Sequence, residues 1–136
     1  QVMLPGGKRD KTDNSLVHTA LREAEEEVNL DSVAVIGTLT PLFIPVSGFY
    51  VLPVVGCVNN IPTLVPEPEE VEYIIIASLN ELFVEANRKF KAMTIQNEKR
   101  KIPYYDVKNE HIWGATAMIL SEFEEILKRQ GLLKLM

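Results

Sequence analysis

Three glutamates in one predicted helix have the spacing in this chain best suited to chemistry. Glu23, Glu26 and Glu27 stand at i, i+3 and i+4, so a helix places them on one arc. Like charges at this spacing repel one another, and a hard divalent cation such as Mg²⁺ or Mn²⁺ would relieve the repulsion, because it prefers carboxylate oxygens. For such a run alone, a solvated acidic helix face is the more common explanation.

A glycine-rich loop just upstream favours the metal site. Pro5, Gly6 and Gly7 neither continue a strand nor start a stable helix, so we expect a loop whose backbone approaches other groups closely. Such a loop can bring carbonyl oxygens to the same cation. The helix that carries the glutamates is predicted over residues 15–28, with Ser15 as its N-cap. Its buried stripe is predicted to consist of Val17, Ala20, Leu21, Ala24 and Val28.

The segment 22–30, Arg-Glu-Ala-Glu-Glu-Glu-Val-Asn-Leu, resembles the Nudix box. The pattern of that box is Gly, five residues, Glu, seven residues, then Arg-Glu-aliphatic-x-Glu-Glu-x-Gly-aliphatic. Counted back from Arg22, the Gly of the box falls on Lys8 and its first Glu falls on Asn14. Gly7 and Asp13 each lie one place earlier. We therefore expect a loop that is one residue longer. Asn29 replaces the closing Gly, a mild change because Asn is the next-best residue in the left-handed conformation.

The flanking segments resemble the coenzyme A diphosphatase branch of the Nudix hydrolases. That branch has Gly-Gln-Val-x-Phe-Pro-Gly-Gly and Thr-Ala-Leu-Arg-Glu-Ala, which residues 1–7 and 19–24 match, with Leu4 in place of the Phe. Residues 53–56, 70–71 and 112–117 match as well. Members of the branch carry a further strand and an Arg-containing segment before the Gln, so we expect this sequence to lack one strand and some substrate contacts.

The resemblance implies metal-dependent hydrolysis of a diphosphate that joins a nucleoside to another group. With coenzyme A or its thioesters as substrate, the products are 3′,5′-ADP and 4′-phosphopantetheine or its acyl form. By motif position, Glu23, Glu26 and Glu27 are the metal ligands, with the Gly7 carbonyl as a fourth. Glu26 is expected nearest the attacking water. Arg22 either pairs with Glu26 and holds it in place, or reaches back to Asp13.

Other residues carry weaker expectations. Lys8 and Arg9 either bind phosphates or contact only solvent, and Glu70 either reaches a metal or is a charge at a strand edge. Glu110 and His111 are expected to contact the start of the last helix rather than to act as an acid–base pair, and nothing near His18 makes it a ligand. For the aromatic side chains of Tyr104, Tyr105 and Trp113, core packing is expected rather than adenine stacking.

Two alternative functions stay open at this point. One is a Nudix hydrolase for ADP-ribose or NADH, because the loops outside the box select the substrate. The other is a Nudix scaffold that binds a nucleotide without turnover. The presence of all three box glutamates argues against the second, because a binding module does not need that cluster of charge.

Length and charge limit the classes of function. The chain has 136 residues, enough for one domain over residues 1–136, and its net charge of −5 with a pI near 5.1 argues against nucleic-acid binding. No apolar run is long enough to span a membrane. The single cysteine, Cys57, cannot form an internal disulfide, so we expect a reducing compartment, the cytoplasm. The expected partner is a small-molecule diphosphate. A homodimer is one option for the oligomeric state.

The pattern of elements predicts an α/β fold, a Nudix-type α/β/α sandwich with a mixed β-sheet. Strands are predicted at 33–42, at 49–58 as a central strand buried on both faces, and at 69–76. Ser78 caps a short helix that runs through Phe83, and strands at 90–95 and 101–107 form a hairpin around residues 97–100. A final helix over 112–130 is predicted to face inward with Trp113, Thr116, Ile119, Leu120, Phe123 and Leu127.

Overall fold

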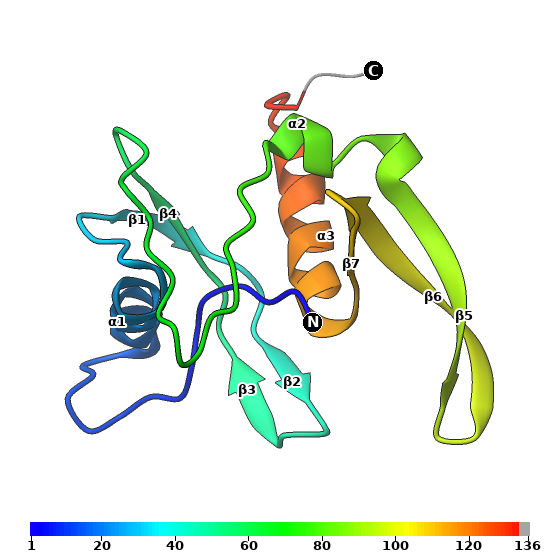
Figure 1. Cartoon of the computed structure of the whole chain (residues 1–136), viewed down its shortest axis with the longest axis horizontal. Helices are drawn as coiled ribbons and strands as arrows, with labels where there is room; N and C mark the ends of the chain where they lie inside the picture. The colour runs from blue at the N-terminus through cyan, green and yellow to red at the C-terminus, as the bar shows by residue number, and fades with distance from the viewer. Residues whose placement is uncertain (134–136) are drawn as a thin grey trace. The chain divides into compact units, whose positions relative to one another are not determined.

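A computed structural model describes residues 1–133, which form two compact units. The glycine-loop unit comprises residues 5–75, and the hairpin unit comprises residues 1–4 and the chain from residue 76 onward (Figure 1). The prediction of one domain over residues 1–136 stays a prediction. No helix in the described part of the chain is long and apolar enough to cross a membrane.

Helix α1, Leu16–Val28, is the main element of the glycine-loop unit, and both of its predicted ends are confirmed. Ser15 Oγ accepts a hydrogen bond from the His18 N–H at 3.2 Å, as an N-cap does. Asn29 adopts the left-handed conformation with φ of 60° and donates its N–H to the Glu25 carbonyl at 3.0 Å. In the predicted stripe only Val28 is fully buried, and the other four residues are half-buried.

The strands of this unit are shorter than the sequence predicts. Antiparallel pairs form between β1, Ala34–Thr38, and β4, Val54–Cys57, and between β2, Leu42–Ile44, and β3, Phe49–Val51. The predicted strands 33–42 and 49–58 are therefore each split in two. Pro53 has no N–H for a ladder, and its carbonyl instead accepts the Leu39 N–H at 2.9 Å. The expectation of a central strand buried on both faces is wrong, because Gly56 and Cys57 are exposed.

The predicted strand at 69–76 is absent, and a turn at residues 68–70 replaces its start. The Glu67 carbonyl accepts the N–H groups of both Glu70 and Val71, at 3.1 and 2.8 Å. The segment before the turn docks on the end of α1, where the Glu67 N–H donates to the Glu27 carbonyl at 2.8 Å. Because the last carbonyls of a helix lack partners within it, this docking satisfies the helix end and fixes the position of Glu70.

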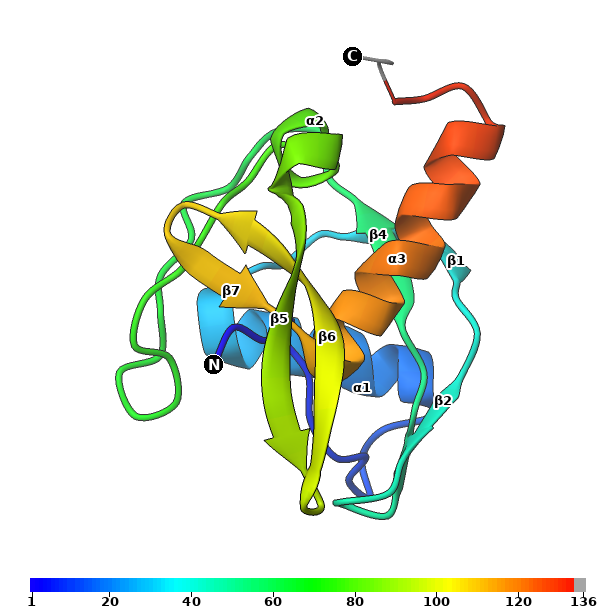
Figure 2. The same ribbon diagram turned by 90° about the vertical axis from the view of Figure 1, so that its right-hand side faces the viewer.

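The hairpin unit is built around a three-stranded antiparallel sheet (Figure 2). Strands β5, Arg88–Ile95, and β6, Glu98–Val107, join through Gln96 and Asn97, both with positive φ as two-residue hairpin turns require. The predicted hairpin is confirmed, with a tighter turn and longer strands. A second such turn at Lys108 and Asn109 leads into β7, Glu110–Ile112, which the sequence analysis missed. Ile112 therefore belongs to a strand and not to the last helix.

Two helices complete the core of this unit. Helix α2, Leu79–Leu82, has the predicted Ser78 cap and is followed by the 3₁₀ helix η1, Glu85–Asn87. Helix α3, Gly114–Arg129, lies beside the sheet (Figure 2). Of the residues predicted to face inward, Leu120 and Leu127 are buried and the other four are half-buried. The core consists of Leu82, Phe83, Tyr105, Val107, Ile112, Ala117, Leu120 and Leu127.

The combination of helices and strands agrees with the predicted α/β class. The strand pairs of the described residues are all antiparallel and lie in three separate sheets. The mixed sheet and the sandwich therefore stay predictions.

A buried tyrosine–glutamate pair stabilises the hairpin unit. The Tyr105 hydroxyl donates to Glu124 Oε1 at 2.8 Å, and Lys128 Nζ lies 3.1 Å from Glu124 Oε2. Burial, followed by the hydrogen bond to Glu124 and its charge, raises the pKa of Tyr105 to about 12. Because the folded-state pKa lies above the unfolded value, this contribution is complete below pH 10 and is lost as the pH rises toward 12.

We therefore expect Tyr105→Phe to lower the free energy of unfolding by about 1–2 kcal/mol at pH 7, since it leaves a buried carboxylate oxygen without its donor. The difference from wild type should shrink between pH 10 and pH 12. Urea unfolding across this range measures it, with Tyr104→Phe on the same strand as the control. A difference that does not change with pH would contradict the assignment.

Candidate metal centre

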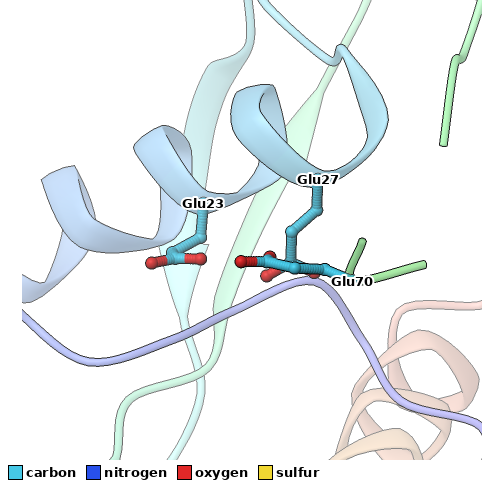
Figure 3. Close-up of side chains that lie close together, drawn as sticks. All are labelled: Glu23, Glu27 and Glu70. Carbon is cyan, nitrogen blue, oxygen red and sulfur yellow. The ribbon is translucent and has the colours of Figure 1, made fainter. Parts of the chain in front are cut away.

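Three carboxylates converge on one point of the glycine-loop unit. Glu23 and Glu27 project from α1 and Glu70 projects from the turn at 68–70, and one oxygen of each lies within 4.8 Å of the others (Figure 3). Glu23 and Glu27 are half-buried, and Glu70 is exposed. The sequence left open whether Glu70 reaches a metal or is a charge at a strand edge, and the structure places it with two of the box glutamates.

The glycine loop packs directly against these carboxylates (Figure 3). A Cβ placed on Gly7 would lie 2.5 Å from Glu23 Cδ, so only glycine fits at this position without a shift. The Gly6 N–H donates to Glu27 Oε1 at 3.3 Å. Assignment of the Gly7 carbonyl as a metal ligand stays a prediction.

Arg22 connects the loop to the helix, and both of the contacts weighed from the sequence are present. Its Nε and Nη2 donate to the two oxygens of Asp13 at 2.8 and 3.0 Å, and its Nη1 donates to Glu26 at 3.1 and 3.2 Å. Nη1 also donates to Glu23 Oε1 at 3.1 Å, and Nη2 donates to the Lys8 carbonyl at 3.2 Å. One guanidinium therefore holds two box glutamates and the loop.

Asp13 is the buried anchor of this network. Its side chain is fully shielded from solvent and also accepts the Thr19 hydroxyl at 2.9 Å and the Asp10 N–H at 3.0 Å. Hydrogen bonds from Arg22 hold the pKa of Asp13 well below its usual range. Sequence reasoning noted the Asp13–Arg22 contact but missed Thr19, whose hydroxyl faces Asp13 from the first turns of α1.

Glu26 lies outside the group of three carboxylates. Its side chain is 57% exposed and points to Arg22. Its assignment as a metal ligand stays a prediction.

The other candidate residues have specific contacts of their own. The Arg9 guanidinium donates to the carbonyls of Asp13 and Asn14, so it braces the loop. His18 Nδ1 accepts the Asn14 N–H at 3.1 Å. In the hairpin unit Tyr105 is a core residue, as expected, whereas the rings of Tyr104 and His111 stack with centroids 4.4 Å apart. Trp113 is half-buried and serves as the N-cap of α3.

The electrostatics of the three carboxylates favour a bound cation. Burial, with contributions from Glu23 and Glu70, raises the pKa of Glu27 to about 7, against the opposing hydrogen bond from Gly6. Burial and the neighbouring carboxylates both disfavour the charged form of Glu27, and a cation bound beside it would offset that cost. Carboxylate oxygens are the donors that Mg²⁺ and Mn²⁺ prefer, so the residues present fit such an ion.

Comparison with known proteins identifies the family. A family model described as NUDIX domain matches residues 1–97. The chain belongs to the Nudix family. Nudix hydrolases generally use divalent metal ions such as Mg²⁺ or Mn²⁺, in agreement with the carboxylate cluster.

Relatives from three bacteria carry the name "Uncharacterized Nudix hydrolase NudL". The protein of Pectobacterium atrosepticum is 38% identical, with 90% of this chain and 64% of the relative covered. The protein of Photorhabdus laumondii is 35% identical, with 92% of this chain and 67% of the relative covered. The protein of Yersinia pestis is 40% identical, with 88% of this chain and 61% of the relative covered. The Nudix chain thus spans about two thirds of the length of these curated relatives. Their names state no substrate.

The contact between Gly7 and Glu23 predicts a difference between neighbouring glycines. Gly7→Ala should weaken Mn²⁺ binding by about tenfold or more, because the new Cβ displaces the Glu23 carboxylate. Gly6→Ala is the matched control, since its Cβ meets no atom within 4 Å and its N–H is retained. Isothermal titration with Mn²⁺ measures both. Equal affinities in the two variants would show that the loop does not shape the site.

Proposed function

We propose that this Nudix chain is a metal-dependent diphosphatase that hydrolyses coenzyme A or its thioesters to 3′,5′-ADP and 4′-phosphopantetheine or its acyl form. The observation that carries the proposal is the convergence of Glu23, Glu27 and Glu70 beneath the glycine loop. Membership of the family supports a hydrolase acting on diphosphate bonds. The choice of coenzyme A rests on the resemblance of residues 1–7 and 19–24 to that branch.

Glu23, Glu27 and Glu70 are the residues that would hold Mg²⁺ or Mn²⁺, and the Gly7 carbonyl and Glu26 are further candidates. When bound, the ion supplies charge neutralisation at the diphosphate oxygens and lowers the pKa of a water molecule. The half-buried positions of Glu23 and Glu27 strengthen their attraction for a cation, because solvent screens them less than it screens an exposed carboxylate.

The proton of the attacking water goes to Glu26 in this proposal. Its carboxylate is exposed, and the two hydrogen bonds from Arg22 Nη1 fix its orientation. The water oxygen attacks one phosphorus, Glu26 accepts the proton, and the bond from that phosphorus to the bridging oxygen breaks. Two phosphate monoesters leave. Lys8 supplies a positive charge for the diphosphate, and Arg22 with Asp13 keeps Glu26 in place.

The test is a substrate panel with Mg²⁺ and with Mn²⁺: coenzyme A, acetyl-coenzyme A, ADP-ribose and NADH. We expect preference for the two coenzyme A compounds. Glu26→Gln should lower kcat by about 10²–10⁴-fold with folding intact, because it removes a proton acceptor and not a packing contact. Glu25→Gln is the matched control, since Glu25 is an exposed glutamate of the same helix outside the cluster.

Each other outcome overturns a defined part of the proposal. Preference for ADP-ribose or NADH would keep the mechanism and discard coenzyme A. Unchanged turnover in Glu26→Gln would remove Glu26 from catalysis. Nucleotide binding without turnover of any compound would identify a binding module in place of an enzyme.

A further inference from the structure

Lys8 follows Gly7 directly, and its backbone and its side chain have separate partners. The carbonyl accepts a hydrogen bond from Arg22 Nη2 at 3.2 Å. The ammonium lies over the ring of Phe49, with Nζ 5.9 Å from the ring centroid, within the range of a cation–π contact. Both contacts lie inside the glycine-loop unit. Lys8 is therefore held at two points, its backbone by Arg22 and its ammonium by Phe49, in the loop that covers the carboxylates.

The β2–β3 hairpin determines where the Phe49 ring lies. Phe49 pairs with Ile44 across the hairpin, directly after a turn in which Gly48 has φ of +74°. Ser47 Oγ accepts the Phe49 N–H at 3.3 Å and fixes the entry into β3. Phe49 is 49% exposed, so its ring contributes little to a hydrophobic core.

Phe43 and Tyr50 lie on the opposite face of the same hairpin. Side chains alternate between faces along a strand, so these two cannot share the face of Phe49. Their rings pack on each other with centroids 5.0 Å apart. Phe43 is 50% exposed, almost the same as Phe49, but the Lys8 ammonium lies over the ring of Phe49. The hairpin thus contains its own matched control.

Lys8 keeps its positive charge available for a ligand. Within residues 1–133 it forms no ion pair with a carboxylate, whereas the guanidinium of Arg22 pairs with four acidic side chains. An aromatic ring attracts an ammonium without neutralising it. Contact with Phe49 also restricts the long lysine side chain before any substrate arrives, which lowers the entropy lost on binding.

We propose that Phe49 is a positioning residue for Lys8, which it holds where the ammonium binds an oxygen of the substrate diphosphate. This inference rests on the proposed function, because it needs a diphosphate at the carboxylate cluster. Phe49 itself touches no reacting atom. The competing explanation is that Phe49 only covers the aliphatic part of Lys8, and leucine would do that equally well.

The test compares variants of the two phenylalanines in steady-state kinetics with Mg²⁺ and coenzyme A. Phe49→Leu should raise KM about two- to fivefold with kcat nearly unchanged, as expected for the loss of an exposed cation–π contact. Phe43→Leu should match wild type, and Phe49→Tyr should restore KM because tyrosine keeps the ring face. In a Lys8→Met background, Phe49→Leu should have no further effect. An equal KM in Phe49→Leu and Phe43→Leu, or a persistent effect in the Lys8→Met background, would overturn the proposal.

A second measurement separates this inference from the proposed function. Reductive ¹³C-methylation of lysines gives an NMR signal for Lys8, assigned by its loss in Lys8→Arg. The Phe49 ring should shift this signal upfield, and Phe49→Leu should abolish the shift while Phe43→Leu keeps it. An unshifted Lys8 signal in wild type would overturn the positioning role even in an active enzyme. A shifted signal in a protein without hydrolysis of any substrate would place the failure in the proposed function.

Discussion

The rest of the candidate site depends on the hydrogen bonds of the Arg22 guanidinium. It joins the buried Asp13 to Glu23, Glu26 and the Lys8 carbonyl, so it fixes the glycine loop on the helix. A planar guanidinium can make these bonds at once because its donors are held in a rigid geometry, which a lysine does not have. Loss of this contact would release the loop and the carboxylates together.

The same arrangement brings together charges that repel. Glu23, Glu27 and Glu70 converge at one point, and the Gly6 N–H offsets only part of the cost at Glu27. Two features permit the convergence: Gly7 leaves room beside Glu23, and the bond from the Glu67 N–H to the Glu27 carbonyl docks the turn of Glu70 on the helix end. A divalent cation bound at this point would complete the balance of charge. The family membership of the chain and its local electrostatics thus both support the proposed metal centre.

Local signals in the sequence predicted the elements that have local causes. Ser15 and Ser78 cap their helices, and Asn29 ends α1 in the left-handed conformation. Features that depend on distant contacts were missed. The Glu67 carbonyl forms a turn where a strand was expected, and the Glu67 N–H docks that turn on the end of α1. In the site, helical spacing predicted that Glu23 and Glu27 act together. It could not show that Glu70 joins them, because that result depends on how a distant segment packs on the helix. The contact of Arg22 with Glu26 is local, at i and i+4, and was one of the two contacts weighed from the sequence.

The central claim is that Glu23, Glu27 and Glu70 form one divalent-metal centre. Anomalous diffraction from crystals of the protein soaked in Mn²⁺ tests it most directly, because the signal locates manganese independently of any activity. The account predicts a manganese peak bonded to oxygens of all three carboxylates. A peak bonded to Glu26 without Glu70, or no peak at this cluster in crystals that bind manganese elsewhere, would contradict it.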